Sequence, residues 1–587
     1  MLRVTRRWCC RRVAWTLILL QLILVAYSAW VHSPTLTEVA YLPAGISHWQ
    51  LGRFELASVS PPLVRLCAAI PAIVIGDPIT DWSSFPHGTG SRPEWTAAPQ
   101  FVELNGPRTF WLFTLGRWGC LPFAAMGAVV CWRWACEAYG ELAGLIAVWL
   151  WCLCPNILGH AALLTPDVGG AAAGALAGYL YWRWLQKPGG WRAVWAGAGL
   201  GLALLSRTTW IILIPLWIVM CVVRMRSPSV KNTLHVHRSK WGIFGVLAIA
   251  LYIVNLGYAF SGSFESLEHY VFVSKTLNGI WETTTKNQFV GSWIGKFPVP
   301  VPRDFLLGMD LQRRDFEEAR WSYLAGQGKY GGWWYYYLYG LAVKLSVGVL
   351  GLFGLAIILS TRRQYRREWY TEALLLVPIA LVLLTVSSQM SFSHHVRYVY
   401  SMLPFFYIWI SKVAQVFSSD RRGVTIIAAS LLVLHGASSL AVYPHSLSYF
   451  NELAGGPNNG HRHLINSNLD WGQDLLLLQH WCQEHPAAKP FFLAYFGGVD
   501  PAAAGIGFDL PIMRDDLPRG LPFSRALAPG WYAVSATLLY GHPYNFATTG
   551  RRSDAIPEAF SYFKDFEPVD QVGYSILIYH LKGNVER

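Results

Sequence analysis

Besides Glu372, which falls at an expected cytoplasmic helix end, five ionisable side chains lie within or at the ends of long apolar stretches of the sequence: Arg117, Asp167, Arg207, Lys344 and Arg397. Charged groups are costly inside a membrane and usually serve a function there. When the apolar stretches are taken as membrane helices, all five fall at the outer ends or in the outer halves of those helices. Four cations and one carboxylate on one face predict a site for an anionic ligand, most simply a phosphate, beside an acid or base. The alternative is that each side chain simply reaches out to the membrane surface.

A further charge, Glu38, lies directly after the first apolar stretch. In the same segment, Pro61 and Pro62 begin a short apolar run, residues 62–76, that contains Arg65. This run is short for a membrane span and predicts a helix lying on the membrane surface. A carboxylate held over the outer surface by such a helix is well placed to deprotonate a hydroxyl group.

The composition indicates a membrane protein with additional soluble mass. Of the 587 residues, 53% are hydrophobic and 14% charged, against roughly a quarter charged in soluble domains. This excludes a disordered chain, a collagen-like fibre and an ordinary cytosolic enzyme. Residues 1–443 hold 37 Lys/Arg and 20 Asp/Glu, whereas residues 444–587 hold 10 and 14. The net charge of +13 therefore belongs to the membrane part, and we expect no nucleic-acid partner.

Apolar runs recur along the first three quarters of the chain and predict about eleven transmembrane helices. The expected spans lie near residues 13–33, 111–131, 142–157, 168–185, 192–206, 209–224, 241–261, 335–359, 371–388, 398–416 and 423–443. Arginines in the opening RRWCCRR predict a cytoplasmic N-terminus. The opening also resembles a twin-arginine signal with a cleavage-like AYSA at 26–29, but the ten later spans favour a retained first helix.

The distribution of basic residues tests this topology. The segments expected inside are 1–12, 132–141, 183–192, 224–240, 361–370 and 412–422, and they hold 21 Lys/Arg and 4 Asp/Glu. The two long loops expected outside, 34–110 and 262–334, hold 12 and 14. Positive charge is thus concentrated inside, as the rule for multi-pass proteins in a plasma or inner membrane requires. The tail from residue 444 onward is then extracytoplasmic.

The tail has the pattern of a small α/β domain. Strand-like runs at 491–498, 530–541 and 574–581 are separated by Pro/Gly turns, and a helical pattern begins after Asp470. Asn468 and Asp470, with Gln473 and Asp474, lie in the stretch SNLDWGQDL. They could bind sugar hydroxyls, or Asn468 or Asp470 could cap the following helix.

The first outer loop resembles that of a known enzyme family. Thr37-Glu38, Tyr41, Ala44-Gly45, Gly52 and Pro61-Pro62-Leu63 follow the order of motifs in the GT-C membrane glycosyltransferases, specifically the protein O-mannosyltransferase and aminoarabinose-transferase relatives. Segments 159–182, 204–215, 332–348 and 391–409 resemble later motifs of the same family. The resemblance covers roughly residues 13–443. It implies a GT-C-like helical membrane domain over residues 1–443, joined to the tail domain over residues 444–587.

The resemblance also implies roles for individual residues. Glu38 would be the general base, and Asp167 would support it or coordinate a divalent metal ion. Arg207, Lys344 and Arg397 would neutralise a lipid phosphate, with Arg65 and Arg117 as further candidates. The chain departs from the family at Thr37, where the family has its catalytic Asp. Either Glu38 takes over the base role, or activity is altered or lost.

Three further residues are candidates for the acceptor or sugar site: Tyr41, His394 and His395. The two histidines are open to three interpretations, as metal ligands, as phosphate donors or as exposed polar residues. Apart from this possibility and the divalent metal ion that Asp167 could coordinate, the sequence indicates no cofactor.

Together these patterns predict an inverting glycosyltransferase, a hexosyl- or pentosyltransferase. It would move a sugar from a polyprenyl-phosphate carrier to an acceptor hydroxyl at the outer membrane face. No nucleotide-phosphate loop is visible in the sequence, which favours a lipid-linked donor. The alternatives are a transporter or flippase of lipid-linked saccharides, which would need polar groups through the depth of the membrane, and an inactive GT-C scaffold.

Overall fold

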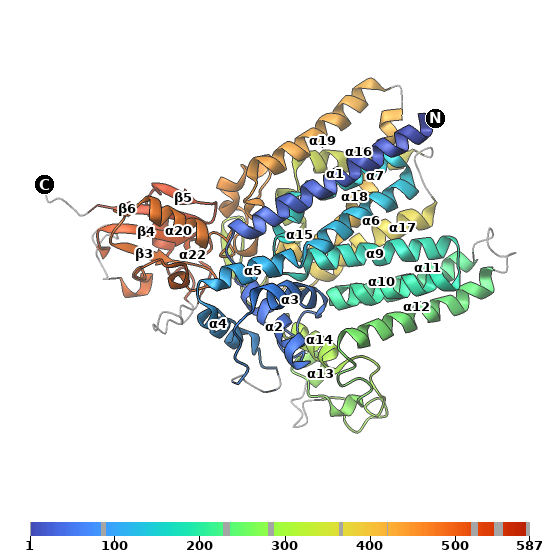
Figure 1. Cartoon of the computed structure of the whole chain (residues 1–587), viewed down its shortest axis with the longest axis horizontal. Coiled ribbons are helices and arrows are strands. Elements are labelled where there is room, and N and C mark those ends of the chain that lie inside the picture. Colours follow the sequence, from blue (N-terminus) through green and yellow to red (C-terminus); the bar gives the residue numbers. More distant parts are fainter. Residues whose placement is uncertain are drawn as a thin grey trace.

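A computed structural model of the chain describes residues 2–83, 88, 90–226, 235–279, 287–362, 368–418, 421–517, 526–544 and 556–582. Parts of the segments expected inside the cytoplasm, within 224–240, 361–370 and 412–422, lie outside these residues. Long helices form one body of the molecule, and the strands of the tail gather at one end of it (Figure 1). The N-terminus lies at the opposite end from that sheet.

The helical body is that of a multi-pass membrane protein. Among the described residues, five helical segments are long and apolar enough to cross a membrane, or up to seven if two bent helix pairs each form one span. The helices of this body are α1 (Leu2–Val31), α5 (Arg108–Trp118), α6 (Leu121–Tyr139), α7 (Glu141–Cys152), α8 (Pro155–Ala161), α9 (Pro166–Gln186), α10 (Gly190–Ser206), α11 (Leu213–Arg226), α12 (His235–Gly257), α15 (Tyr336–Lys344), α16 (Val347–Thr361), α17 (Trp369–Ser387), α18 (Leu403–Ile410) and α19 (Arg422–Val442).

Two expected spans are interrupted by a sharp bend. The stretch 142–157 is divided between α7 and α8, with a bend of 57° between the two helices. The stretch 335–359 is divided between α15 and α16, with a bend of 112°. Pro155 opens α8, and Ser346 caps α16 by accepting a hydrogen bond from the Val349 N–H. Both features start a new helix rather than continue the old one. Hydropathy averages over such breaks and misses them.

The expected outer loops contain helices of their own. The first loop holds α2 (Glu38–Leu51), α3 (Leu63–Gly76) and α4 (Glu94–Asn105), and the second holds α13 (Lys275–Asn278), α14 (Arg303–Asp315) and the hairpin β1 (Trp321–Leu324) and β2 (Gln327–Tyr330). The helix expected over 62–76 is thus present as α3. Arg92 at the start of α4 and Asp315 at the end of α14 form an ion pair of 2.8 Å, which joins the two loops.

The tail contains a four-stranded sheet in the order β3 (Phe491–Ala494), β4 (Gly530–Ser535), β6 (Ile576–Leu581) and β5 (Asp570–Val572). Strands β3 and β4 are parallel, with Phe491 opposite Trp531, and the other two pairings are antiparallel. The helical pattern after Asp470 is α20 (Leu475–Glu484), and the run 530–541 ends as a short helix, α22 (Ala536–Leu539).

Small residues allow the membrane helices to approach closely. In α9, Gly174 and Gly178 recur at a spacing of four and lie on one face. A β-carbon at Gly174 would overlap the indole of Trp210, and one at Gly178 would lie 2.9 Å from Phe405. The Trp210 indole N–H donates to the Gly170 carbonyl across the same interface, at 2.7 Å. Close helix contact through small residues is how membrane helices gain packing energy.

We predict that Gly174→Ala destabilises the protein by about 1–3 kcal/mol, because the added methyl group overfills a packed interface. Gly245→Ala in α12 is the matched control, since a β-carbon there meets no atom within 4 Å. The control should be neutral or stabilising by up to about 1 kcal/mol. Unfolding of the two detergent-purified variants measures the difference, and equal stability would contradict the close α9–Trp210 contact.

Candidate active site

A polar cavity of about 230 Å³ opens between the first outer loop, the starts of the membrane helices and the loop before η4 (Val396–Met402). Asp167 lies in its wall, in the first turn of α9, where Pro166 opens the helix and a carboxylate is favoured by the helix dipole. Arg207 and Arg397 each donate to one oxygen of this carboxylate, both at 2.9 Å. The three charges predicted from α9, the end of α10 and the late span are therefore brought together.

Arg397 keeps hydrogen-bonding capacity in this position. Its guanidinium lies 4.5 Å from the centre of the Trp471 ring, which fixes its plane, and its Nε is buried without a hydrogen-bond partner among the described residues. Arg207 lies 5.6 Å from the centre of the Tyr398 ring. Two guanidinium groups on one carboxylate leave one positive charge uncompensated. This is the chemistry of a site that receives an anion.

The cavity has further charged residues that the sequence did not single out. Arg92 and Glu94 come from the first outer loop, and Asp315 and Arg320 come from the second. Asp315 accepts hydrogen bonds from Arg92 at 2.8 Å and from Arg320 at 2.9 Å. In the sequence, these four residues were marked only by the large number of charged residues in the two outer loops. Counted with Arg207, Arg397 and Asp167, the lining holds four arginines and three carboxylates, a net charge of 4 − 3 = +1.

Tyr41, His394 and His395 also line the cavity, as does Thr37. The Tyr41 hydroxyl lies 3.2 Å from Ser60 Oγ. Burial lowers the pKa of His394 to about 4 and that of His395 well below its usual range, so both imidazoles are neutral at pH 7. His394 is bonded to the Trp321 carbonyl, and His395 Nδ1 lies 2.7 Å from Ser467 Oγ. Both side chains are partly buried in the cavity wall and hydrogen-bonded there, so they are not freely exposed polar residues.

Glu38 and Arg117 do not line the cavity. Glu38 is 0% exposed, and both its oxygens are occupied by Arg117, at 2.9 and 2.7 Å. The same carboxylate accepts from the Thr35 N–H and hydroxyl and from the Leu164 N–H, at 2.7–2.9 Å. Arg117 also donates to the carbonyls of Ala29, His32 and Ser33. This arrangement does not suit the expected proton-accepting role of Glu38 or a phosphate contact by Arg117; it fixes the segment before Asp167.

Two other predicted phosphate ligands also lie outside the cavity lining. Lys344 ends α15, and its ammonium group donates to the carbonyls of Leu447 and Asn468, at 3.0 and 2.7 Å. Arg65 in α3 donates to His48 Nε2 and to the carbonyls of Ala57 and Ser60. Both cations are used to hold backbone and loop groups in place. The sequence places Lys344 within one expected span, 335–359, and Arg65 within the short helix 62–76, but it could not show which way either side chain points.

The tail residues Asn468 and Asp470 are buried and hold backbone. Asn468 accepts from the Val396 N–H at 3.0 Å and donates to the His394 carbonyl at 2.8 Å, which fixes the segment that carries Arg397. Asp470 accepts from the Thr537 N–H at 2.8 Å, and burial raises the pKa of its carboxyl to about 7. The N-cap of α20 is Asp474, so the capping interpretation of Asn468 and Asp470 is wrong, and neither lines the cavity.

We predict that Glu38→Gln destabilises the protein by about 3–5 kcal/mol, because it leaves the buried Arg117 guanidinium without its counter-charge. Glu484→Gln is the control, since that carboxylate is 58% exposed. Thermal unfolding of the detergent-purified variants measures the effect. A Glu38→Gln protein as stable as the control would show that the pair contributes little to the fold.

Several solved structures are similar to the chain, and two of them hold a lipid phosphate. ArnT from Cupriavidus metallidurans, bound to undecaprenyl phosphate, has 12% identity and a TM-score of 0.45 over 97% of this chain and 98% of that chain. AglB from Archaeoglobus fulgidus, an archaeal oligosaccharyltransferase in complex with an inhibitory peptide and a dolichol-phosphate, has 10% identity and a TM-score of 0.41 over 94% and 75%. No curated protein matches the sequence.

A family model described as dolichyl-phosphate-mannose-protein mannosyltransferase matches residues 113–258. The matched segment contains Arg117, Asp167 and Arg207. It confirms that the chain resembles this family of membrane glycosyltransferases, as its motifs predict.

Proposed function

We propose that the chain is a polyprenyl-phosphate-dependent glycosyltransferase, a hexosyl- or pentosyltransferase that inverts the sugar carbon. The observation that carries this proposal is the pair Arg207 and Arg397 on the single carboxylate of Asp167, at the wall of a polar cavity. The family match over the segment that contains Asp167 and Arg207 supports it.

The two arginines suit the phosphate of the carrier lipid. In the proposed reaction the acceptor oxygen attacks the sugar carbon from the face opposite the phosphate, and the bond from that carbon to the phosphate oxygen breaks. The electron pair of that bond remains on the departing polyprenyl phosphate, whose negative charge then increases. Arg207 and Arg397 would stabilise this charge with their guanidinium groups.

The acceptor hydroxyl must lose its proton, and Glu94 is the best-placed group to take it. Three carboxylates line the cavity. Both oxygens of Asp167 and both of Asp315 accept from arginines. Glu94 is bonded to Arg92 through Oε1, and its Oε2 accepts no hydrogen bond from any described residue. We therefore propose Glu94 as the base, with Asp167 positioning the two arginines and Glu38 positioning the Asp167 segment.

The proposal includes the orientation of the chain. Eleven spans, a cytoplasmic N-terminus and an extracytoplasmic domain over residues 444–587 would put the cavity at the outer face. The cavity lining supports this, because it combines residues from both long loops with the helix ends that carry Asp167, Arg207 and Arg397.

An inactive scaffold is the second candidate function. Thr37 lines the cavity at the position where the family has its catalytic Asp, and it cannot accept a proton as a carboxylate does. A scaffold of this kind would still bind the carrier lipid. The two candidates therefore agree on phosphate binding and differ on transfer.

We predict that Arg397→Ala weakens binding of undecaprenyl phosphate by about ten-fold or more, because a charge-assisted hydrogen bond is worth about 1.5–3 kcal/mol. Arg514→Ala is the control, since Arg514 forms an exposed ion pair with Glu558 on the tail. Binding to detergent-purified protein measures the effect. Equal binding by both variants, or no binding by the unaltered protein, would remove the lipid-phosphate premise.

We predict that Glu94→Gln lowers sugar transfer by about 100-fold or more while leaving undecaprenyl phosphate binding within about two-fold, since general-base catalysis contributes roughly that factor. Transfer from a panel of radiolabelled polyprenyl-phosphate sugars to membrane acceptors measures the first quantity. Glu484→Gln should keep full activity. Binding without transfer in the unaltered protein would favour the scaffold, and full activity in Glu94→Gln would assign the base elsewhere.

A further inference from the structure

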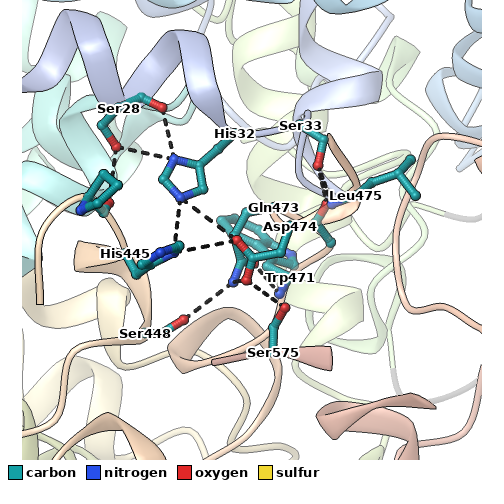
Figure 2. A network of polar contacts seen from close by, with 12 residues as sticks. Ser28, His32, Ser33, His445, Ser448, Trp471, Gln473, Asp474, Leu475 and Ser575 are labelled. Carbon is teal, nitrogen blue, oxygen red and sulfur yellow. Dashed lines mark hydrogen bonds and ion pairs between the residues drawn. The ribbon is translucent and has the colours of Figure 1, made fainter. Parts of the chain in front are cut away.

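Three potential metal ligands from distant parts of the sequence meet outside the cavity: His32, His445 and Asp474. His32 directly follows α1, His445 lies just after α19, and Asp474 is the N-cap of α20 in the tail. Figure 2 shows the two imidazoles and the carboxylate pointing toward one another. The cluster thus lies where the ends of two apolar helices meet the tail.

The separations in this cluster are those between ligands of one metal ion. His32 Nε2 lies 3.5 Å from His445 Nδ1, and Asp474 Oδ1 lies 3.7 Å from His32 Nε2 and 3.8 Å from His445 Nδ1. Good hydrogen bonds are shorter, about 2.7–3.2 Å. Two nitrogen or oxygen ligands on a tetrahedral ion with bonds near 2.0–2.1 Å are separated by roughly 3.3–3.4 Å. A movement of a few tenths of an ångström would bring all three atoms to bonding distance.

For His32 and Asp474, the surrounding hydrogen bonds leave a lone pair free on the atom that faces the cluster. His32 Nδ1 lies 2.9 Å from the Ser28 carbonyl, so Nδ1 carries the proton and Nε2 has its lone pair directed at the cluster (Figure 2). Ligating histidines in metal sites are oriented by such bonds. Asp474 Oδ2 accepts from Ser575 at 2.7 Å and from Gln473 at 3.2 Å. Its Oδ1 is fully buried and has no hydrogen-bond partner among the described residues.

A buried carboxylate oxygen without a partner is costly unless a cation or donor meets it. Gly573, with φ of +57°, packs against this carboxylate, and a β-carbon there would overlap Asp474 Oδ2. The backbone is therefore shaped around the carboxylate. The His445 side chain is 24% exposed, which gives an ion access to the cluster.

From these observations we propose that His32, His445 and Asp474 bind one divalent transition-metal ion, most simply Zn²⁺. Two imidazole nitrogens and one carboxylate oxygen are a ligand set that suits Zn²⁺, with water completing four-fold coordination. None of the three residues lines the cavity, so the ion is structural. It ties the end of the first helix and the end of α19 to the tail. The proposal does not depend on the transferase function.

The test is zinc content by mass spectrometry. The full chain is purified in detergent with an affinity tag that contains no histidine, exposed to ZnCl₂ and freed of unbound metal by gel filtration. About one Zn²⁺ per chain is expected for the unaltered protein, and at least a five-fold lower content for His445→Asn and Asp474→Asn. His480→Asn is the matched control, because His480 is 68% exposed on the same tail, and it should keep the full content.

A second measurement does not require a variant to fold. The unaltered protein loaded with Co²⁺ should show the strong visible absorption of a tetrahedral nitrogen–oxygen site, and excess Zn²⁺ should abolish it. EDTA should lower the thermal midpoint of the unaltered protein. Absence of stoichiometric zinc and of the Co²⁺ spectrum in the unaltered protein, or full zinc content in well-folded Asp474→Asn, would overturn the proposal.

Discussion

The buried ion pair between Glu38 and Arg117 joins three segments that are distant in the sequence: the chain from the end of α1 to the start of α2, helix α5, and the residues before α9. Arg117 in α5 donates to the carbonyls of Ala29 in α1 and of His32 and Ser33 after it, while Glu38 begins α2 and accepts from the Leu164 N–H before α9. Removal of one partner from such a pair leaves a buried charge without compensation. The position of Asp167, three residues after Leu164, thus depends on a pair that never meets the ligand. Glu38, which the sequence suggests as the base, therefore contributes to the site by fixing the position of the segment that carries Asp167.

Residues of the tail, like those of the membrane helices, hold the side chains of the cavity in position. Trp471 lies against the Arg397 guanidinium, and Asn468 fixes the backbone on both sides of His395 through the His394 carbonyl and the Val396 N–H. Lys344 in turn holds the carbonyls of Leu447 and Asn468. A chain truncated after α19 would lose the support of Arg397, so the tail and the cavity form one functional unit. A metal ion at His32, His445 and Asp474 would fasten the same junction from its other side.

The sequence correctly predicts a multi-pass body of apolar helices, because hydropathy is a local property, whereas its count of eleven spans compares with five to seven among the described residues. It also identifies Asp167, Arg207 and Arg397, which the structure brings together at the cavity. It cannot separate them from Lys344, Arg65 and Arg117, which occupy similar places in the pattern but bind backbone carbonyls or Glu38. That difference is decided by contacts across the fold. Arg92 and Asp315 show the same limit, since 223 residues separate two side chains that form one ion pair.

The electrostatics of the cavity explain why its arginines are paired before any ligand binds. An arginine held by Asp167 has already lost most of its side-chain freedom during folding, so a phosphate does not have to order it. Because Arg207 and Arg397 share that one carboxylate, neither is fully neutralised, and the local field remains positive. The Asp167 carboxylate therefore orients both guanidinium groups, and one positive charge remains to attract an anionic ligand. Replacing it with a neutral amide would raise the positive charge while loosening the geometry, and preorganised geometry is what stabilises the charge of a departing phosphate.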